Sequence, residues 1–349
     1  MKTGFSIYLS SGIEKNEEVI RKAKNAGASY GFTSLHIPEE DYEDYKKRVV
    51  QLLDLTNKAG IELMIDVDGD TPNRLGLKHM GDLLDYGVTS IRLDYGFSDK
   101  DVVALSKHFD IVWNASTTSP SDIKKWEALG ADISRFTACH NYYPKPYTGL
   151  DVDRVKDINT NLRIAGYRVS AFIPGDKDFR GPLYQGLPTI EEHRSSCKKV
   201  ALNMLELYRA NTDIVMVGDV DLSDEGWQQF KWLSDGIIPL RVTLDNDYTE
   251  LYGKIGHERP DSSSYIIRVE ESRGWFAGKS IVPKNTVDCK VGSISIGNDS
   301  YLRYKGELEI CRMPRIADEK VNVIGQVWEE DLEYIPFIES GMGVVLQKK

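Results

Sequence analysis

The sequence lacks the features of a membrane, secreted or nucleic-acid-binding protein. No apolar run approaches the roughly 18 residues of a membrane span, and the short apolar run at the N-terminus reaches charged residues too soon for a signal peptide. Lys and Arg form no run, and the formal net charge is -10, whereas a nucleic-acid binder normally carries a basic patch. The widely spaced cysteines form no CxxC pair, as is typical of reduced thiols; they are Cys139, Cys197, Cys289 and Cys311. We therefore expect a cytoplasmic protein that binds neither nucleic acid nor a membrane.

Motifs for metal, nucleotide and nucleophile chemistry are also absent. The six histidines include no HxH or HExxH pair, so we expect no zinc site. Neither a GxSxG elbow nor a Walker loop occurs, and no GxGxxG follows a predicted strand. No lysine ends a predicted strand, which argues against Schiff-base or pyridoxal-phosphate chemistry. The sequence therefore predicts no metal and no cofactor.

What the sequence does contain is a regular alternation of strand and helix patterns over its first two thirds. Eight β patterns, each followed by a helical one, are predicted at 4–10, 30–38, 61–68, 90–96, 110–116, 132–141, 168–176 and 213–219. Eight such units match a parallel TIM (β/α)8 barrel, whereas the alternative, a doubly wound sheet, usually has fewer strands.

After Ile237 the pattern changes to short β segments separated by turn residues. A chain of 349 residues also exceeds what one core usually holds. We therefore expect a TIM-barrel catalytic domain over 1–238 and a small β-rich domain, of the barrel type, over 239–349.

Polar residues at the predicted strand ends are candidate site residues, because active sites of such barrels lie at the C-terminal ends of the strands. These residues are Asp66, Asp68, Arg92, Asp94, Asn114, Ser116, His140, Asn141, Tyr142, Asp176 and Asp219. Asp66 and Asp68 share a strand face at a Cα separation of about 7 Å, which should raise the pKa of at least one carboxyl. A carboxylic acid beside an ionised carboxylate suits acid/base hydrolysis.

Each of these candidates also has a structural alternative. Either aspartate could cap the next helix or hold an arginine, and Asp94 could pair with Arg92. His140 could be a core histidine, Asn114 a turn residue, and Asp219 the N-cap of the last helix.

The segment GDKDFRGPLYQGLPTIEEHR, residues 175–194, is long and rich in charge. The loops after strands seven and eight of these barrels often hold phosphate, and arginine suits bidentate phosphate recognition. We therefore expect Arg180, His193 and Arg194 to bind an anion, while Glu191 could instead favour a helix N-terminus.

Several motifs together resemble the bacterial 6-phospho-N-acetylmuramidase family, some of whose members are labelled "outer surface protein". They are SIYLS, DVDGDTPNRLG, SIRLDYG, NAST, HNYYPKPYTGL, GPLYQGLPTIEEHR and YKGELEI, spread over nearly the whole chain. The resemblance implies a TIM-like barrel followed by a cyclophilin-like β domain. It also implies cytoplasmic hydrolysis of the β-1,4 bond of MurNAc-6-phosphate–GlcNAc during peptidoglycan recycling, a form of amino-sugar catabolism.

The strand-end positions, and not the resemblance, select the candidate catalytic residues. Asp66 and Asp68 come first, with Asp94 and Glu191 in reserve. We expect the following residues to bind substrate: Asn114, His140, Asn141, Tyr142, Tyr147, Arg180, His193, Arg194 and Asp219. Retaining, inverting and substrate-assisted hydrolysis all fit this set.

Two other functions fit the same residues, namely a non-catalytic phosphosugar-binding protein and another phosphosugar-acting TIM-barrel enzyme. The expected partner is the phosphorylated amino-sugar disaccharide, and the sequence is compatible with a homo-oligomer.

Overall fold

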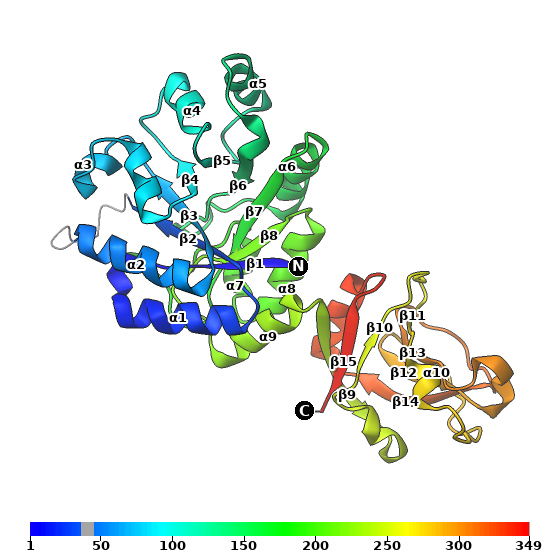
Figure 1. Cartoon of the computed structure of the whole chain (residues 1–349). Helices are drawn as coiled ribbons and strands as arrows, with labels where there is room; N and C mark the ends of the chain where they lie inside the picture. Colours follow the sequence, from blue (N-terminus) through cyan, green and yellow to red (C-terminus); the bar gives the residue numbers. More distant parts are fainter. Residues whose placement is uncertain (36–44, 349) are drawn as a thin grey trace. The chain divides into compact units, whose positions relative to one another are not determined.

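The chain divides into two compact units, Met1–Ser234 and Asp235–Lys349. The computed structural model describes residues 1–35 and 45–348 (Figure 1). The predicted boundary, after residue 238, is a few residues further along. None of the helices in the described ranges is both long and apolar enough to cross a membrane.

The first unit is a closed barrel of eight parallel strands, which confirms the predicted TIM-type architecture. The strands follow one another around the barrel in chain order, and β8 pairs with β1 to close it. Their bounds are β1 Lys2–Ser6, β2 Tyr30–Ser34, β3 Glu62–Val67, β4 Ser90–Leu93, β5 Asp110–Asn114, β6 Phe136–Cys139, β7 Arg168–Ile173 and β8 Ile214–Val217.

Helices follow the strands and surround the barrel (Figure 1). Their bounds are α1 Ile13–Asn25, α2 Tyr45–Ala59, α3 Thr71–Leu75, α4 Asp99–Leu105, α5 Pro120–Ala128, α6 Val152–Ile164, α7 Glu192–Ser195, α8 Val200–Arg209 and α9 Asp224–Ser234. A serine caps α5, because the Ser119 hydroxyl accepts a hydrogen bond from the Asp122 amide at the start of the helix. The start of the helix predicted after Glu39 lies outside the described residues.

Apolar side chains fill the interior of the barrel, in a cluster of Phe32, Met64, Val112, Cys139, Phe172, Ile214 and Met216. Because side chains alternate along a strand, residues two positions after these share the inward direction. Ser34, Asp66 and Asn114 follow Phe32, Met64 and Val112 in this way, and Arg92 is the register partner of Asp66. The strand alternation therefore turns polar side chains toward the C-terminal mouth of the barrel.

Several strands are shorter than predicted. β1 ends at Ser6 and is followed by a 3-10 helix at Leu9–Ser11. β6 ends at Cys139, so His140 and Asn141 lie in the segment that follows the strand. Tyr8 lies between the end of β1 and the 3-10 helix, where it is buried.

The second unit contains a seven-stranded mixed sheet and the short helix α10 Ser272–Trp275. The sheet order is β10-β15-β9-β14-β12-β13-β11, with β15 and β9 parallel and the other pairs antiparallel. Bounds are β9 Ile237–Leu244, β10 Ile255–His257, β11 Ile266–Val269, β12 Ser293–Gly297, β13 Leu308–Cys311, β14 Val321–Val327 and β15 Gly343–Gln347. A bridge between Glu258 and Val269 links the two edges, and the unit is β-rich as predicted.

Candidate active site

A buried ion pair joins adjacent strands at the mouth of the barrel. Arg92 Nη1 on β4 donates to Asp66 Oδ1 on β3 at 2.7 Å, and Arg92 Nη2 donates to Asn141 Oδ1. Both charged residues are only 5% exposed. Burial opposes the charge on Arg92, but Asp66 reverses the effect, and the pKa of Arg92 lies above its ordinary value. A fixed positive charge therefore sits beside Asp66.

Asp94 is the first residue after β4, two positions beyond Arg92, and is exposed. Its backbone amide donates to Val67 O at 3.0 Å, and its charge acts on Arg92. With strands about 4.8 Å apart and a rise of about 3.3 Å per residue, the Cα atoms of Asp66 and Asp94 are about 8 Å apart.

Asp68 does not form the predicted acid pair with Asp66. Asp68 Oδ1 accepts hydrogen bonds from the Thr71 hydroxyl at 2.9 Å, from the Asp70 amide at 3.1 Å and from Arg74. Burial works to raise the pKa of Asp68, but hydrogen bonds from Arg74, Tyr95 and Thr71 outweigh it and the pKa is lowered. Asp68 is therefore not the carboxyl with a raised pKa that the predicted pair requires, and its carboxylate organises the turn into α3.

The Tyr142 ring packs against two phenylalanines close to the charged residues of the barrel mouth. The Tyr142 ring meets the edges of Phe32 and Phe172, at centroid separations of 5.9 and 5.2 Å. Burial raises the pKa of Tyr142, and the charges that act on it belong to Arg180, Asp66 and Arg92. The structure thus brings these three charged side chains around one ring.

Sequence reasoning missed Tyr8 as a site residue, and it named Arg92 as a strand-end candidate without assigning it a catalytic or binding role. Tyr8 follows β1, packs with Leu187 and Tyr142, and donates its hydroxyl hydrogen to Gly218 O. The guanidinium carbon of Arg180 lies 4.4 Å from the Tyr8 ring centroid. The sequence placed Tyr8 inside the predicted first strand, 4–10, and within the SIYLS motif, and neither observation singled out its side chain.

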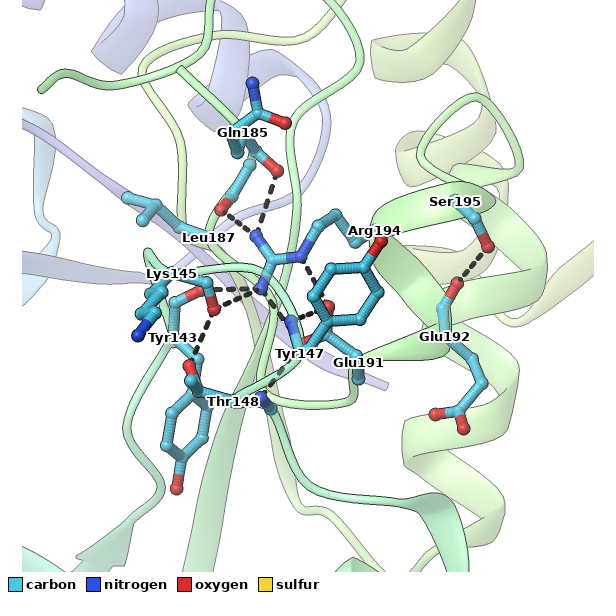
Figure 2. A network of polar contacts seen from close by, with 12 residues as sticks. Tyr143, Lys145, Tyr147, Thr148, Gln185, Leu187, Glu191, Glu192, Arg194 and Ser195 are labelled. Carbon is cyan, nitrogen blue, oxygen red and sulfur yellow. Dashed lines mark hydrogen bonds and ion pairs between the residues drawn. The ribbon is translucent and has the colours of Figure 1, made fainter. Parts of the chain in front are cut away.

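Glu191 and Arg194 clamp two loops together (Figure 2). Glu191 accepts from the Tyr147 amide and the Gly149 amide, both at 2.8 Å, and from Arg194 Nε at 2.8 Å. Hydrogen bonds from Arg194 are the largest cause that lowers the pKa of Glu191, to about 2. A firmly anionic Glu191 is poorly suited to serve as a general acid.

The remaining N–H groups of Arg194 donate hydrogen bonds to backbone carbonyls. Its Nη1 donates to Gln185 O and Gly186 O at 2.9 and 2.7 Å, and its Nη2 donates to Tyr143 O at 2.7 Å. All three guanidinium nitrogens are thus engaged within the protein, which leaves little for a phosphate (Figure 2).

The two predicted histidines are buried among internal partners. His140 Nδ1 lies 3.0 Å from the Ser116 hydroxyl, and Nε2 lies 2.7 Å from Asn159 Oδ1 on α6. Burial lowers the pKa of His140 to about 4, so the ring is neutral at pH 7. His193 is fully buried, with Nε2 2.9 Å from Glu206 Oε2. The contacts of His140 match its core-histidine alternative, and the burial of His193 beside a carboxylate does not suit the anion binding that we predicted for it.

Asp219 holds the loop that follows β7 and does not cap α9. Its carboxylate accepts backbone amides of Gly175 at 2.8 Å, Arg180 at 2.9 Å and Leu187 at 2.9 Å. Burial raises the pKa of Asp219, although the three amides oppose the shift. Asp219 is 1% exposed. Its contact with the Arg180 amide holds the backbone of Arg180 in place.

Asn114 and Tyr147, both predicted to bind substrate, differ in exposure. Asn114 Oδ1 accepts the Ser116 amide at 2.9 Å, as a turn residue would, and the residue is half-buried. Tyr147 is 93% exposed, with a positive φ of 66° that the Glu191 contact helps to hold.

Within 1–35 and 45–348, no group of three or more His, Cys, Asp or Glu residues is placed to hold a metal ion.

Comparisons with known proteins cover both units. The family models "6-phospho-N-acetylmuramidase, N-terminal" and "6-phospho-N-acetylmuramidase, C-terminal" match residues 3–232 and 238–347. A conserved Enterococcus faecalis protein with an unknown function is 30% identical, with a TM-score of 0.79 over 100% of this chain and 97% of that one. An uncharacterized B. cereus protein is 25% identical, with a TM-score of 0.75 over 99% of each chain.

The comparison with curated proteins found no match. The two family models nevertheless span nearly all of the sequence, one over the barrel and the other over the β-rich unit. The chain therefore belongs to the 6-phospho-N-acetylmuramidase family.

Proposed function

We propose that this protein is a glycoside hydrolase that cleaves the β-1,4 bond of MurNAc-6-phosphate–GlcNAc in cytoplasmic peptidoglycan recycling, by carboxylate chemistry without a metal. The family supports a muramidase. The observation that carries the proposal is the pair of carboxylates, Asp66 and Asp94, whose charges both act on buried Arg92 at the barrel mouth. The β-rich unit is expected to have a cyclophilin-like shape.

The two carboxylates have different surroundings, which suits them to different tasks. Asp66 is buried and bound to Arg92, so it serves as the anion that stabilises positive charge at the anomeric carbon. Asp94 is exposed and can exchange a proton with the leaving oxygen as general acid. Asp66 then acts as nucleophile, activates water, or orients the substrate's own acetamide, according to the stereochemical route.

Asn141 and Tyr142 complete the proposed sugar site. Asn141 is tied through its side-chain oxygen to Arg92, which leaves its amide hydrogens for a sugar hydroxyl or acetamide. Tyr142, held by edge-to-face contacts with Phe32 and Phe172, forms the apolar side of this site.

The direct test is hydrolysis of MurNAc-6-phosphate–GlcNAc by the purified protein, followed by mass spectrometry. Asp66→Asn and Asp94→Asn should each lower kcat by about 10²–10⁴-fold. Asp157→Asn, an exposed change on α6, serves as the matched control and should leave kcat unchanged. Tight binding of the disaccharide without any cleavage by the wild type would instead favour the phosphosugar-binding alternative.

A further inference from the structure

Among the described residues, Arg180 differs from the neighbouring arginines Arg92 and Arg194 in having no carboxylate bound to its guanidinium. Arg92 is bound to Asp66, Arg194 to Glu191, and Lys15 to two aspartates of the loops after β7 and β8. The Arg180 guanidinium has no hydrogen bond or ion pair to any described residue, and its Nε is buried without a partner. Arg180 is half-buried, and a buried N–H without an acceptor costs free energy unless a ligand accepts its hydrogen bond.

The Tyr8 ring supports Arg180 from one side. The guanidinium carbon lies 4.4 Å from the ring centroid, within the range of a cation–π contact. Tyr8 itself is 1% exposed, and its hydroxyl is anchored to Gly218 O. Because the ring satisfies the face of the guanidinium and none of its N–H groups, those donors stay available for an acceptor.

The backbone under Arg180 is also held in place. The Asp219 carboxylate binds the amide of Arg180 together with those of Gly175 and Leu187. Arg180 therefore stands in a braced loop between the ends of β7 and β8, where barrels of this type often bind phosphate.

We infer that Arg180, lying on Tyr8, is the specificity-determining residue that binds the phosphate monoester of the substrate. The inference rests on the proposed function and names the group by which that site distinguishes a phosphorylated sugar from its unphosphorylated form. A phosphate dianion can accept two parallel N–H bonds from one guanidinium, which a hydroxyl cannot. Arg194, similar in the sequence, has its donors filled by carbonyls and is excluded.

Binding measurements test this inference separately from catalysis. Calorimetry would compare MurNAc-6-phosphate with MurNAc on the full-length wild type, Arg180→Gln and Arg180→Lys. We expect Arg180→Gln to weaken binding of the phosphorylated sugar by on the order of 10–100-fold and to leave the affinity for MurNAc unchanged. Arg180→Lys should recover only part of the loss, because lysine lacks the planar fork.

Lys177→Gln is the matched control, since it removes one exposed positive charge from the same loop. It should bind both sugars as the wild type does. Tyr8→Phe keeps the ring and should retain selectivity, whereas Tyr8→Leu removes the platform and should reduce the preference for the phosphorylated sugar. Thermal unfolding of each variant checks that the barrel is intact.

The two proposals fail in distinguishable ways. Selective binding through Arg180 without cleavage of the disaccharide would overturn the hydrolase and leave this inference standing. Full cleavage by the wild type, with Arg180→Gln retaining its preference for the phosphorylated sugar, would overturn the inference alone. An equal loss of affinity for both sugars in folded Arg180→Gln would overturn it too, because it would indicate a general sugar contact.

Discussion

At the scale of single residues, the same side-chain type has different tasks according to what surrounds it. Asp66 is bound to a buried arginine on the adjacent strand, whereas Asp68 accepts hydrogen bonds from Thr71 and Arg74 of the helix that follows it. Charge at a strand end therefore marks a candidate, and the partners decide its role.

His140 provides a prediction about pH and stability. Burial lowers the pKa of His140 from the ordinary 6.5 to about 4. Between these two pH values the imidazole is mostly protonated in the unfolded chain and mostly neutral in the folded chain. The stabilisation is complete above pH 6.5 and is lost as the pH falls toward 4. Between pH 7.5 and 5 we expect His140 to lower the free energy of unfolding by about 2 kcal/mol.

Urea unfolding at the two pH values, for wild type and His140→Gln, measures this contribution. The variant should have a smaller pH dependence than the wild type. His108→Gln, which changes an exposed histidine, is the control. The same change in the free energy of unfolding between the two pH values for wild type and His140→Gln would contradict the buried, neutral state of the ring.

At the scale of elements, the loops after β6 and β7 are built as one unit. Glu191 accepts amides from the first loop, and Arg194 donates to carbonyls of both. Gly149 fits against Glu191 so closely that an added Cβ would come within 2.7 Å of its Oε2. The segment that connects β6 to α6 therefore depends on a carboxylate more than 40 residues away.

Glu191→Gln should loosen these loops, because glutamine cannot accept from both amides and from Arg194 together. We expect faster hydrogen exchange at the amides of Tyr147 and Gly149, with little change in the barrel strands. Glu192→Gln, an exposed neighbouring change, should leave both rates unaltered. Unchanged exchange in Glu191→Gln would mean that the clamp does not hold the loop.

The sign of the pH effect at this clamp is the usual one for a carboxylate. The pKa of Glu191 is lowered from 4.5 to about 2, so its stabilisation is present above pH 4.5 and is lost as the pH falls toward 2. Solvent screening of this partly exposed pair limits the effect to on the order of 1 kcal/mol.

At the scale of the whole molecule, each of the two units has its own hydrophobic core. Met64 and Phe172 lie in the barrel interior, and Ile294 and Ile310 are fully buried in the sheet of the second unit. Separate cores allow separate unfolding. In scanning calorimetry of the full chain we expect a calorimetric enthalpy larger than the van't Hoff enthalpy. Equal values would show that the chain unfolds as one cooperative unit.

The barrel and the β-rich unit were predictable from the sequence because their signals are local. Strand and helix patterns alternate within short windows, and caps such as Ser119 depend on residues only a few positions away. The strand ends were predicted less well, since the point at which β1 or β6 leaves the barrel depends on closure by distant strands.

The sequence by itself determined the order of elements, the family and a set of polar residues near the strand ends. Only the tertiary structure separated Arg180 from Arg194 and Asp66 from Asp68, because the deciding partners are mostly far away along the chain. Tyr8 meets Arg180, and Arg92 meets Asn141, only after the barrel has closed. Local patterns set the elements, and long-range packing set the chemistry of the candidate site.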